Sequence, residues 1–77
     1  MKFNLNVEYV ASFSADVDLP IKEWREVKEW FVKWNVLHYM LNGDTEYREI
    51  DLQDQMPDSS EMLDIKHPVK VYVREVD

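Results

Sequence analysis

The sequence contains no cysteine and only one glycine among its 77 residues. The absence of cysteine excludes a disulfide framework, a zinc ribbon and catalysis by a thiol. A single glycine excludes a glycine-rich phosphate-binding loop. No apolar run approaches the roughly 18 residues that a membrane span needs, and the first ten residues alternate polar and apolar, unlike a secretory signal. We therefore expect a single domain over residues 1–77, located in the cytoplasm and without a membrane partner.

Basic charge is also scarce, because 9 Lys and Arg face 16 Asp and Glu, for a net charge of −7. This balance argues against direct binding to nucleic acid or to an anionic membrane. Apolar residues make up 45% of the chain, which argues against disorder. A short, acidic, cysteine-free chain of this kind is like many small phage or bacterial regulatory proteins.

Residues 3–17 alternate apolar and polar side chains with a period of two, which is typical of a strand with one buried face. Val10 is the one apolar residue at an even position. Since no Gly or Asn marks a turn there, we expect one long strand bent near Val10 rather than two paired strands. The odd, inward positions are Phe3, Leu5, Val7, Tyr9, Ala11, Phe13, Ala15 and Val17.

The period then changes, and the sequence predicts an amphipathic helix over residues 21–34. Asp18 would be its N-cap, and Pro20 would lie near the first turn. Half of the helical wheel is apolar, and its three Trp are expected in the core rather than on a nucleic-acid stacking surface, because basic residues do not surround them. The apolar stripe comprises Ile21, Trp24, Val27, Trp30, Phe31 and Trp34.

The remaining chain predicts three further strands. Residues 36–41 and 45–52 flank Asn42-Gly43, a strong hairpin signal. Residues 53–67 form a long acidic loop or a short helical turn, and Pro68 precedes a last strand over 69–76. The predicted fold class is α+β in the order β-α-β-β-β, with one amphipathic helix packed on a four-stranded antiparallel or mixed sheet.

The negative charge is concentrated in one segment. Residues 44–64 hold eight acids and one base, whereas the rest of the chain holds eight of each. Segregated acidity produces a local negative field that attracts basic partners. We therefore predict a partner-binding surface here, with Tyr47 or Met56 as an apolar anchor. Its predicted residues are Asp44, Glu46, Tyr47, Glu49, Asp51, Asp54, Asp58, Glu61 and Asp64.

These features favour a small interaction module, a regulator or inhibitor that covers a basic surface of a partner protein. A nucleic-acid-binding enzyme is the expected partner, since carboxylates on alternate strand positions could occupy sites for phosphates. The competing interpretation is that these acids only keep a loop solvated and protect a strand edge against aggregation. A different class of function is assembly, in which residues 2–9 or 69–76 pair with another chain or with a second copy. The expected oligomeric state is a monomer or a homodimer.

The sequence gives no support for an enzyme, a metal site or a cofactor. His38 and His67 lie 29 residues apart without a partner at metal-ligand spacing. The acids do not have the spacing of a calcium loop. Ser12, Ser14, Ser59 and Ser60 have no evident base nearby, which leaves His38 as the best candidate base of a small enzyme.

Overall fold

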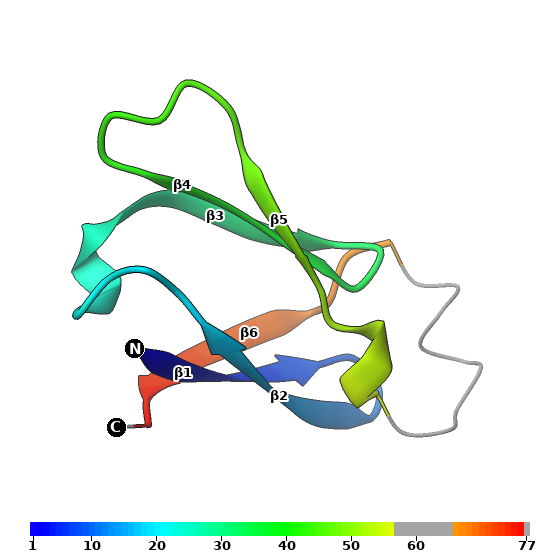
Figure 1. Cartoon of the computed structure of the whole chain (residues 1–77). Helices are drawn as coiled ribbons and strands as arrows, with labels where there is room; N and C mark the ends of the chain where they lie inside the picture. The colour runs from blue at the N-terminus through cyan, green and yellow to red at the C-terminus, as the bar shows by residue number, and fades with distance from the viewer. Residues whose placement is uncertain (57–65, 77) are drawn as a thin grey trace.

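The fold is all-β and consists of two antiparallel sheets of three strands each (Figure 1). The computed structural model describes residues 1–56 and 66–76. Within these ranges the helical structure is limited to two three-residue 3-10 helices, η1 (Trp24–Glu26) and η2 (Gln53–Gln55), and no helix is long and apolar enough to cross a membrane. The strands are β1 (Lys2–Glu8), β2 (Ser12–Asp18), β3 (Val27–Lys33), β4 (Val36–Leu41), β5 (Arg48–Asp51) and β6 (Lys70–Glu75).

The two sheets face each other with their apolar sides. Sheet A has the order β2-β1-β6 and sheet B the order β3-β4-β5. In sheet A, Leu5 of the central strand is opposite Ala15 and Val73. In sheet B, Leu37 of the central strand is opposite Val32 and Ile50. Residues directly opposite in antiparallel strands project to the same face, so these rows form the two inner surfaces.

Aromatic side chains join the two sheets. The Trp24 ring of η1 lies 5.2 Å from the ring of Phe3 in sheet A and 5.4 Å from that of Trp30 in sheet B. Each of these pairs has the edge-to-face geometry that favours aromatic contact. The buried core consists of Phe3, Leu5, Val7, Tyr9, Phe13, Ala15, Val17, Leu19, Val32, Leu37, Tyr39 and Leu52.

The predicted single bent strand is wrong, because residues 2–18 form a hairpin. The inward-facing residues were identified correctly except for Ala11, which is exposed at the turn. Val10, the exception in the pattern, lies fully exposed at the tip, and the Tyr9 N–H donates to the Ala11 carbonyl at 2.7 Å. A three-residue turn therefore reverses the chain without Gly or Asn.

The predicted helix over residues 21–34 is also wrong, and with it the α+β class. Only η1 is helical, and the following residues form β3, an edge strand paired with β4. Three residues already conflict with the helical pattern at 100° per residue: Glu23 and Lys28 fall inside the apolar stripe, and Val32 falls outside it. Val32 is buried in the structure, whereas Trp34 is 46% exposed. The abundance of aromatic and β-branched residues suits a strand.

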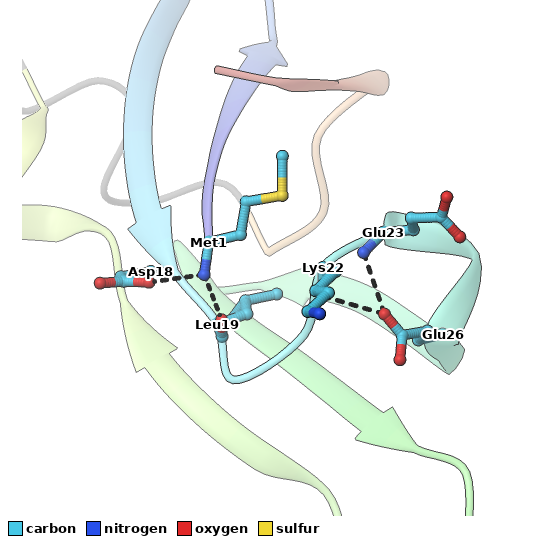
Figure 2. Close-up of polar contacts among 6 residues, drawn as sticks. All are labelled: Met1, Asp18, Leu19, Lys22, Glu23 and Glu26. Atoms are coloured by element: carbon cyan, nitrogen blue, oxygen red, sulfur yellow. Dashed lines mark hydrogen bonds and ion pairs between the residues drawn. The ribbon is translucent and has the colours of Figure 1, made fainter. Parts of the chain in front are cut away.

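Asp18 does not cap a helix. Its carboxylate lies 3.2 Å from the amino group of Met1, which also donates to the Leu19 carbonyl at 2.8 Å (Figure 2). Figure 2 also shows Glu26, whose Oε2 accepts the N–H groups of Lys22 and Glu23 at 2.9 Å each. These two backbone hydrogen bonds lower the pKa of Glu26. The predicted N-cap at Asp18 is therefore wrong, and the Glu26 side chain closes the single 3-10 turn of η1 instead.

Sheet B contains two different turns. Trp34 and Asn35 have φ of 53° and 60°, as a two-residue type I′ hairpin turn between β3 and β4 requires. Asn42-Gly43 does connect β4 to β5 as predicted, but within a longer loop. There Gly43 has φ of 92° and the Asp44 N–H donates to the Leu41 carbonyl at 3.0 Å, as in a type II turn.

Candidate functional site

The described part of the acidic segment lies on β5, on the loop before it and on η2 after it. β5 is an edge of sheet B, because among the described strands it pairs only with β4. Its residues Glu49 and Asp51 are exposed, whereas Ile50 faces the core. Alternation along the strand therefore places Glu49 and Asp51 together on the outer face, as predicted for a row of carboxylates.

Asp44 is held by a local ion pair rather than left free. Arg48 donates from Nε and from a terminal nitrogen to the two Asp44 oxygens at 2.9 and 3.2 Å. The Leu41 N–H donates to the same carboxylate at 3.0 Å. The Arg48 guanidinium and this N–H together lower the pKa of Asp44. Asp44 therefore closes the loop, and its charge is neutralised locally.

An aromatic cluster lies on the outer face beside Glu49. Phe31, His38 and Glu49 are directly opposite one another across the three strands. The Phe31 and His38 rings are stacked with centroids 4.6 Å apart, and His38 Nδ1 lies 3.3 Å from Glu49 Oε1. The Tyr47 ring contacts Phe31 edge-on at 5.1 Å. We call Phe31, His38 and Tyr47 the outer aromatic cluster.

Tyr47 links this cluster to a further acid. Its hydroxyl donates to Glu29 Oε2 at 2.8 Å, and this hydrogen bond to a carboxylate raises the pKa of Tyr47. The Tyr47 side chain is still 41% exposed. It therefore presents apolar surface between the carboxylates of Glu29 and Glu49.

The other predicted site residues lie along the same edge or outside the described ranges. Asp51 accepts the Gln53 N–H at 2.8 Å and so begins η2, while Glu46 and Asp54 are exposed. Met56 packs against the core, so the structure does not support it as a surface anchor. Asp58, Glu61 and Asp64 lie outside the described residues. We call Glu46, Glu49, Asp51 and Asp54 the acidic edge.

Sequence reasoning missed three contributors to this surface. Glu29 and Phe31 are predicted in a helix, and His38 is predicted as a strand residue with a satisfied ring rather than as part of this surface. The available signal was the period-two pattern of residues 29–33, in which Trp30 and Val32 face inward and Phe31 faces outward. The apolar residues at helical spacing over residues 21–34 favoured the helix instead.

No metal-binding group of three or more His, Cys, Asp or Glu side chains occurs in residues 1–56 and 66–76. His38 is held between the Phe31 ring and Glu49, and its side chain is 17% exposed. His67 Nδ1 lies 3.3 Å from the Val32 carbonyl oxygen. Each His thus has a structural partner.

The structure also changes the candidate edges for assembly. β1 lies between β2 and β6, so the prediction that residues 2–9 form an edge available for pairing is wrong. β6 does lie at an edge of sheet A. The predicted strand 69–76 therefore remains a candidate for pairing with another chain.

The fold and this surface define a class: a small two-sheet β domain with an acidic edge and an adjacent aromatic cluster. Comparison with known proteins finds no matching family model, no similar curated protein and no similar solved structure. Functional arguments therefore depend on the surface chemistry of this chain.

Proposed function

We propose that the chain is a protein-protein interaction module that covers a basic surface of a partner and so blocks the partner's normal ligand. The observation that carries the proposal is the acidic edge together with the half-exposed Tyr47. Glu49 and Asp51 lie on the outer face of β5, and the exposed residues Glu46 and Asp54 lie on the loop before β5 and on η2 after it. Tyr47, on the same loop as Glu46, is 41% exposed. Tyr residues are frequent anchors of interfaces, and surrounding charge determines partner choice and association rate.

Local charge supports a basic partner. Residues 44–56 contain five acids and one base, and the one base, Arg48, is already paired with Asp44. The charge of the acidic edge is therefore not neutralised within this segment. Its nearby carboxylates attract Lys and Arg over about 8–10 Å at physiological salt.

The proposed mechanism is occlusion of a nucleic-acid-binding enzyme in the cytoplasm. Such enzymes have strongly basic surfaces that bind phosphates. The carboxylates of Glu49 and Asp51 project to one face at the spacing of alternate strand residues, roughly 6.6–6.8 Å. They would occupy Lys and Arg sites that otherwise hold the nucleic-acid backbone. Tyr47 would contribute apolar contact at the centre of the interface.

The test uses the immobilised chain as bait for a cell lysate, followed by displacement of labelled DNA from each captured protein. We expect a basic partner that binds at low salt, is released near 1 M salt, and loses its DNA when the free chain is added. In the variant Glu49→Gln/Asp54→Asn, capture should decrease by about tenfold, because two of the attractive charges are removed.

A matched control changes the same charge elsewhere. The variant Glu8→Gln/Asp18→Asn has the same net charge of −5 but keeps the acidic edge. It should capture the partner as well as the unchanged chain does. Equal losses in both variants, or capture that persists at high salt, would contradict the proposed surface.

A further inference from the structure

Three of the four sheet edges are covered or short. At the β2 edge, the Gln55 side-chain amide bonds to the backbone of Asp16, accepting its N–H at 2.7 Å and donating to its carbonyl at 2.8 Å. At the β3 edge, His67 Nδ1 lies 3.3 Å from the Val32 carbonyl oxygen, and in the turn that follows the Trp34 N–H donates to the Lys66 carbonyl at 2.8 Å. β5 has only four residues. Among the described strands, β6 has six residues and pairs with β1 alone, and near its end the Trp24 N–H of η1 donates to Glu75 Oε1 at 3.4 Å.

The register shows which backbone groups of β6 point outward. The Val76 N–H donates to the Lys2 carbonyl at 3.1 Å, in continuation of the pairing of Phe3 with Glu75. Backbone groups alternate in direction along a strand, so the even-numbered residues of β6 face β1. The N–H and C=O groups of Val71, Val73 and Glu75 therefore point away from β1, and no other strand described in the structure pairs with them.

The side chains on the outer face of β6 form a basic row. Lys70 Nζ lies 4.7 Å from the centre of the Tyr72 ring, and Tyr72 is 47% exposed. Arg74 has no carboxylate within ion-pair distance among the described residues. A shallow groove of about 280 Å³ runs beside this row and is lined by Asn4, Asn6, Ser14, Tyr72, Val73 and Arg74.

The charge of this edge is opposite to that of the whole chain. Residues 66–76 contain three bases and one acid, in a protein with a net charge of −7. Free edge strands add extended peptides through backbone hydrogen bonds, while alternate side chains determine specificity. A partner strand would therefore meet Lys70, Tyr72 and Arg74 at every second residue.

We propose that the β6 edge binds an extended acidic segment of a partner protein as a fourth strand of sheet A. The segment has acids at positions i and i+4, opposite Arg74 and Lys70, and an apolar residue at i+2, opposite Tyr72. Its backbone bonds to Val71, Val73 and Glu75. This interaction goes beyond the proposed function, because it uses the other sheet and a partner of opposite charge.

A second copy of the chain fits this edge less well. Antiparallel pairing of two β6 strands would bring two basic rows together, and facing like charges destabilise strand pairs. An acidic strand instead forms ion pairs with both bases. Charge complementarity therefore favours a different chain as the occupant.

The test is titration of the ¹⁵N-labelled full chain with the capped peptide Thr-Glu-Thr-Val-Thr-Glu-Thr, followed by NMR. We expect the amide signals of Val71, Val73 and Glu75 to shift and to gain protection from hydrogen exchange. The peptide Thr-Lys-Thr-Val-Thr-Lys-Thr should bind about tenfold more weakly, because both charge contacts become repulsive.

Two protein variants locate the interaction. Lys70→Glu/Arg74→Glu should weaken binding of the acidic peptide by about tenfold. The matched control Lys22→Glu/Lys28→Glu has the same net charge of −11, but its substitutions lie outside β6. Its affinity for the acidic peptide should stay within about twofold of that of the unchanged chain, because only long-range electrostatic attraction is altered. Val71→Pro removes an outward N–H while retaining the β1 bonds, and should also weaken binding.

Several outcomes would overturn the proposal. One is equal binding of the two peptides, and another is a peptide response confined to sheet B. If sedimentation shows a dimer and hydrogen exchange shows protected β6 amides, the edge is assigned to a second copy instead. A failure of the acidic edge to capture a basic partner would leave these peptide results unaffected, so the two proposals are tested separately.

Discussion

Asn35 has an unusual combination of backbone and side-chain constraints. Its φ of 60° lies in the left-handed region, and its side chain is completely buried. The Tyr9 hydroxyl donates to Asn35 Oδ1, and the Leu52 N–H donates to the Asn35 carbonyl at 2.9 Å. One residue thus connects the turn of sheet B with sheet A and with the end of β5.

We predict that Asn35→Ala lowers the free energy of unfolding by about 2–4 kcal/mol, because Ala is strained at positive φ and leaves a buried hydroxyl unpaired. Asn35→Gly should be less harmful by about 1 kcal/mol, since Gly adopts this φ freely. Urea unfolding followed by Trp fluorescence measures both values. An Ala variant as stable as the Gly variant would show that the turn conformation is unimportant.

Asp44 gives a prediction about acid stability. Its folded-state pKa is lowered by Arg48 and by the Leu41 N–H, so the ionised form is favoured by folding. The resulting stabilisation is present above the unfolded-state pKa of about 3.9 and is lost as pH falls through the folded-state value. Asp44→Asn should therefore be less stable than the unchanged chain at pH 7.

The difference between these two proteins should shrink as the pH is lowered from 7 through the folded-state pKa of Asp44, because protonation removes the carboxylate charge. Urea midpoints over a series of decreasing pH values provide the measurement, with Glu46→Gln as a control that removes a neighbouring charge without this ion pair. A difference that is independent of pH would mean that the carboxylate charge does not matter.

At the scale of elements, β3 shows how sheet pairing overrides local pattern. Residues 21–34 contain apolar residues at helical spacing, but β4 supplies a partner strand and the two inner faces require Trp30 and Val32. Helix propensity is a weak preference that tertiary context regularly overrides. The strand state also positions Phe31 against His38, which a helix would not do.

Val32 distinguishes the strand from the predicted helix. In the strand its side chain is buried, so Val32→Ala should cost about 2 kcal/mol of stability through lost apolar contact and a small cavity. In an exposed helical position, Ala would instead be neutral or stabilising. Chemical denaturation decides between them, and Lys28→Ala serves as the exposed control with an expected change within about 0.5 kcal/mol.

At the scale of the whole molecule, opposite charges are separated onto two sheet edges. The acidic edge lies on sheet B, while the basic row of β6 lies on sheet A. The excess of acids makes the folded chain repel itself electrostatically. Because added ions screen this repulsion, stability should depend on ionic strength.

We predict that NaCl from about 10 to 150 mM raises the urea midpoint of the unchanged chain, since the Debye length falls from about 30 to 8 Å. Glu46→Gln/Asp54→Asn should show a smaller increase, because it has two fewer acidic charges at the acidic edge. Denaturation curves at matched pH provide the comparison. A midpoint that falls with salt would show that attractive ion pairs outweigh the net repulsion.

The sequence alone determined the parts of this protein that depend on local pattern. The alternation of residues 3–17 identified most of the inward face of β1 and β2, Asn42-Gly43 located the connection between β4 and β5, and the last strand was predicted at its approximate place. The segregation of acids into residues 44–64 is likewise a property of the sequence. Each of these follows from neighbouring residues and needs no knowledge of distant contacts.

Only the tertiary structure decided the features that depend on pairing between distant segments. It divided residues 2–18 into a hairpin, made residues 27–33 a strand, and assigned the strands to two sheets. It also left the acidic edge exposed and brought Glu29 to Tyr47. The physical reason is that a short apolar segment fits either period until a partner strand and a buried face determine its conformation.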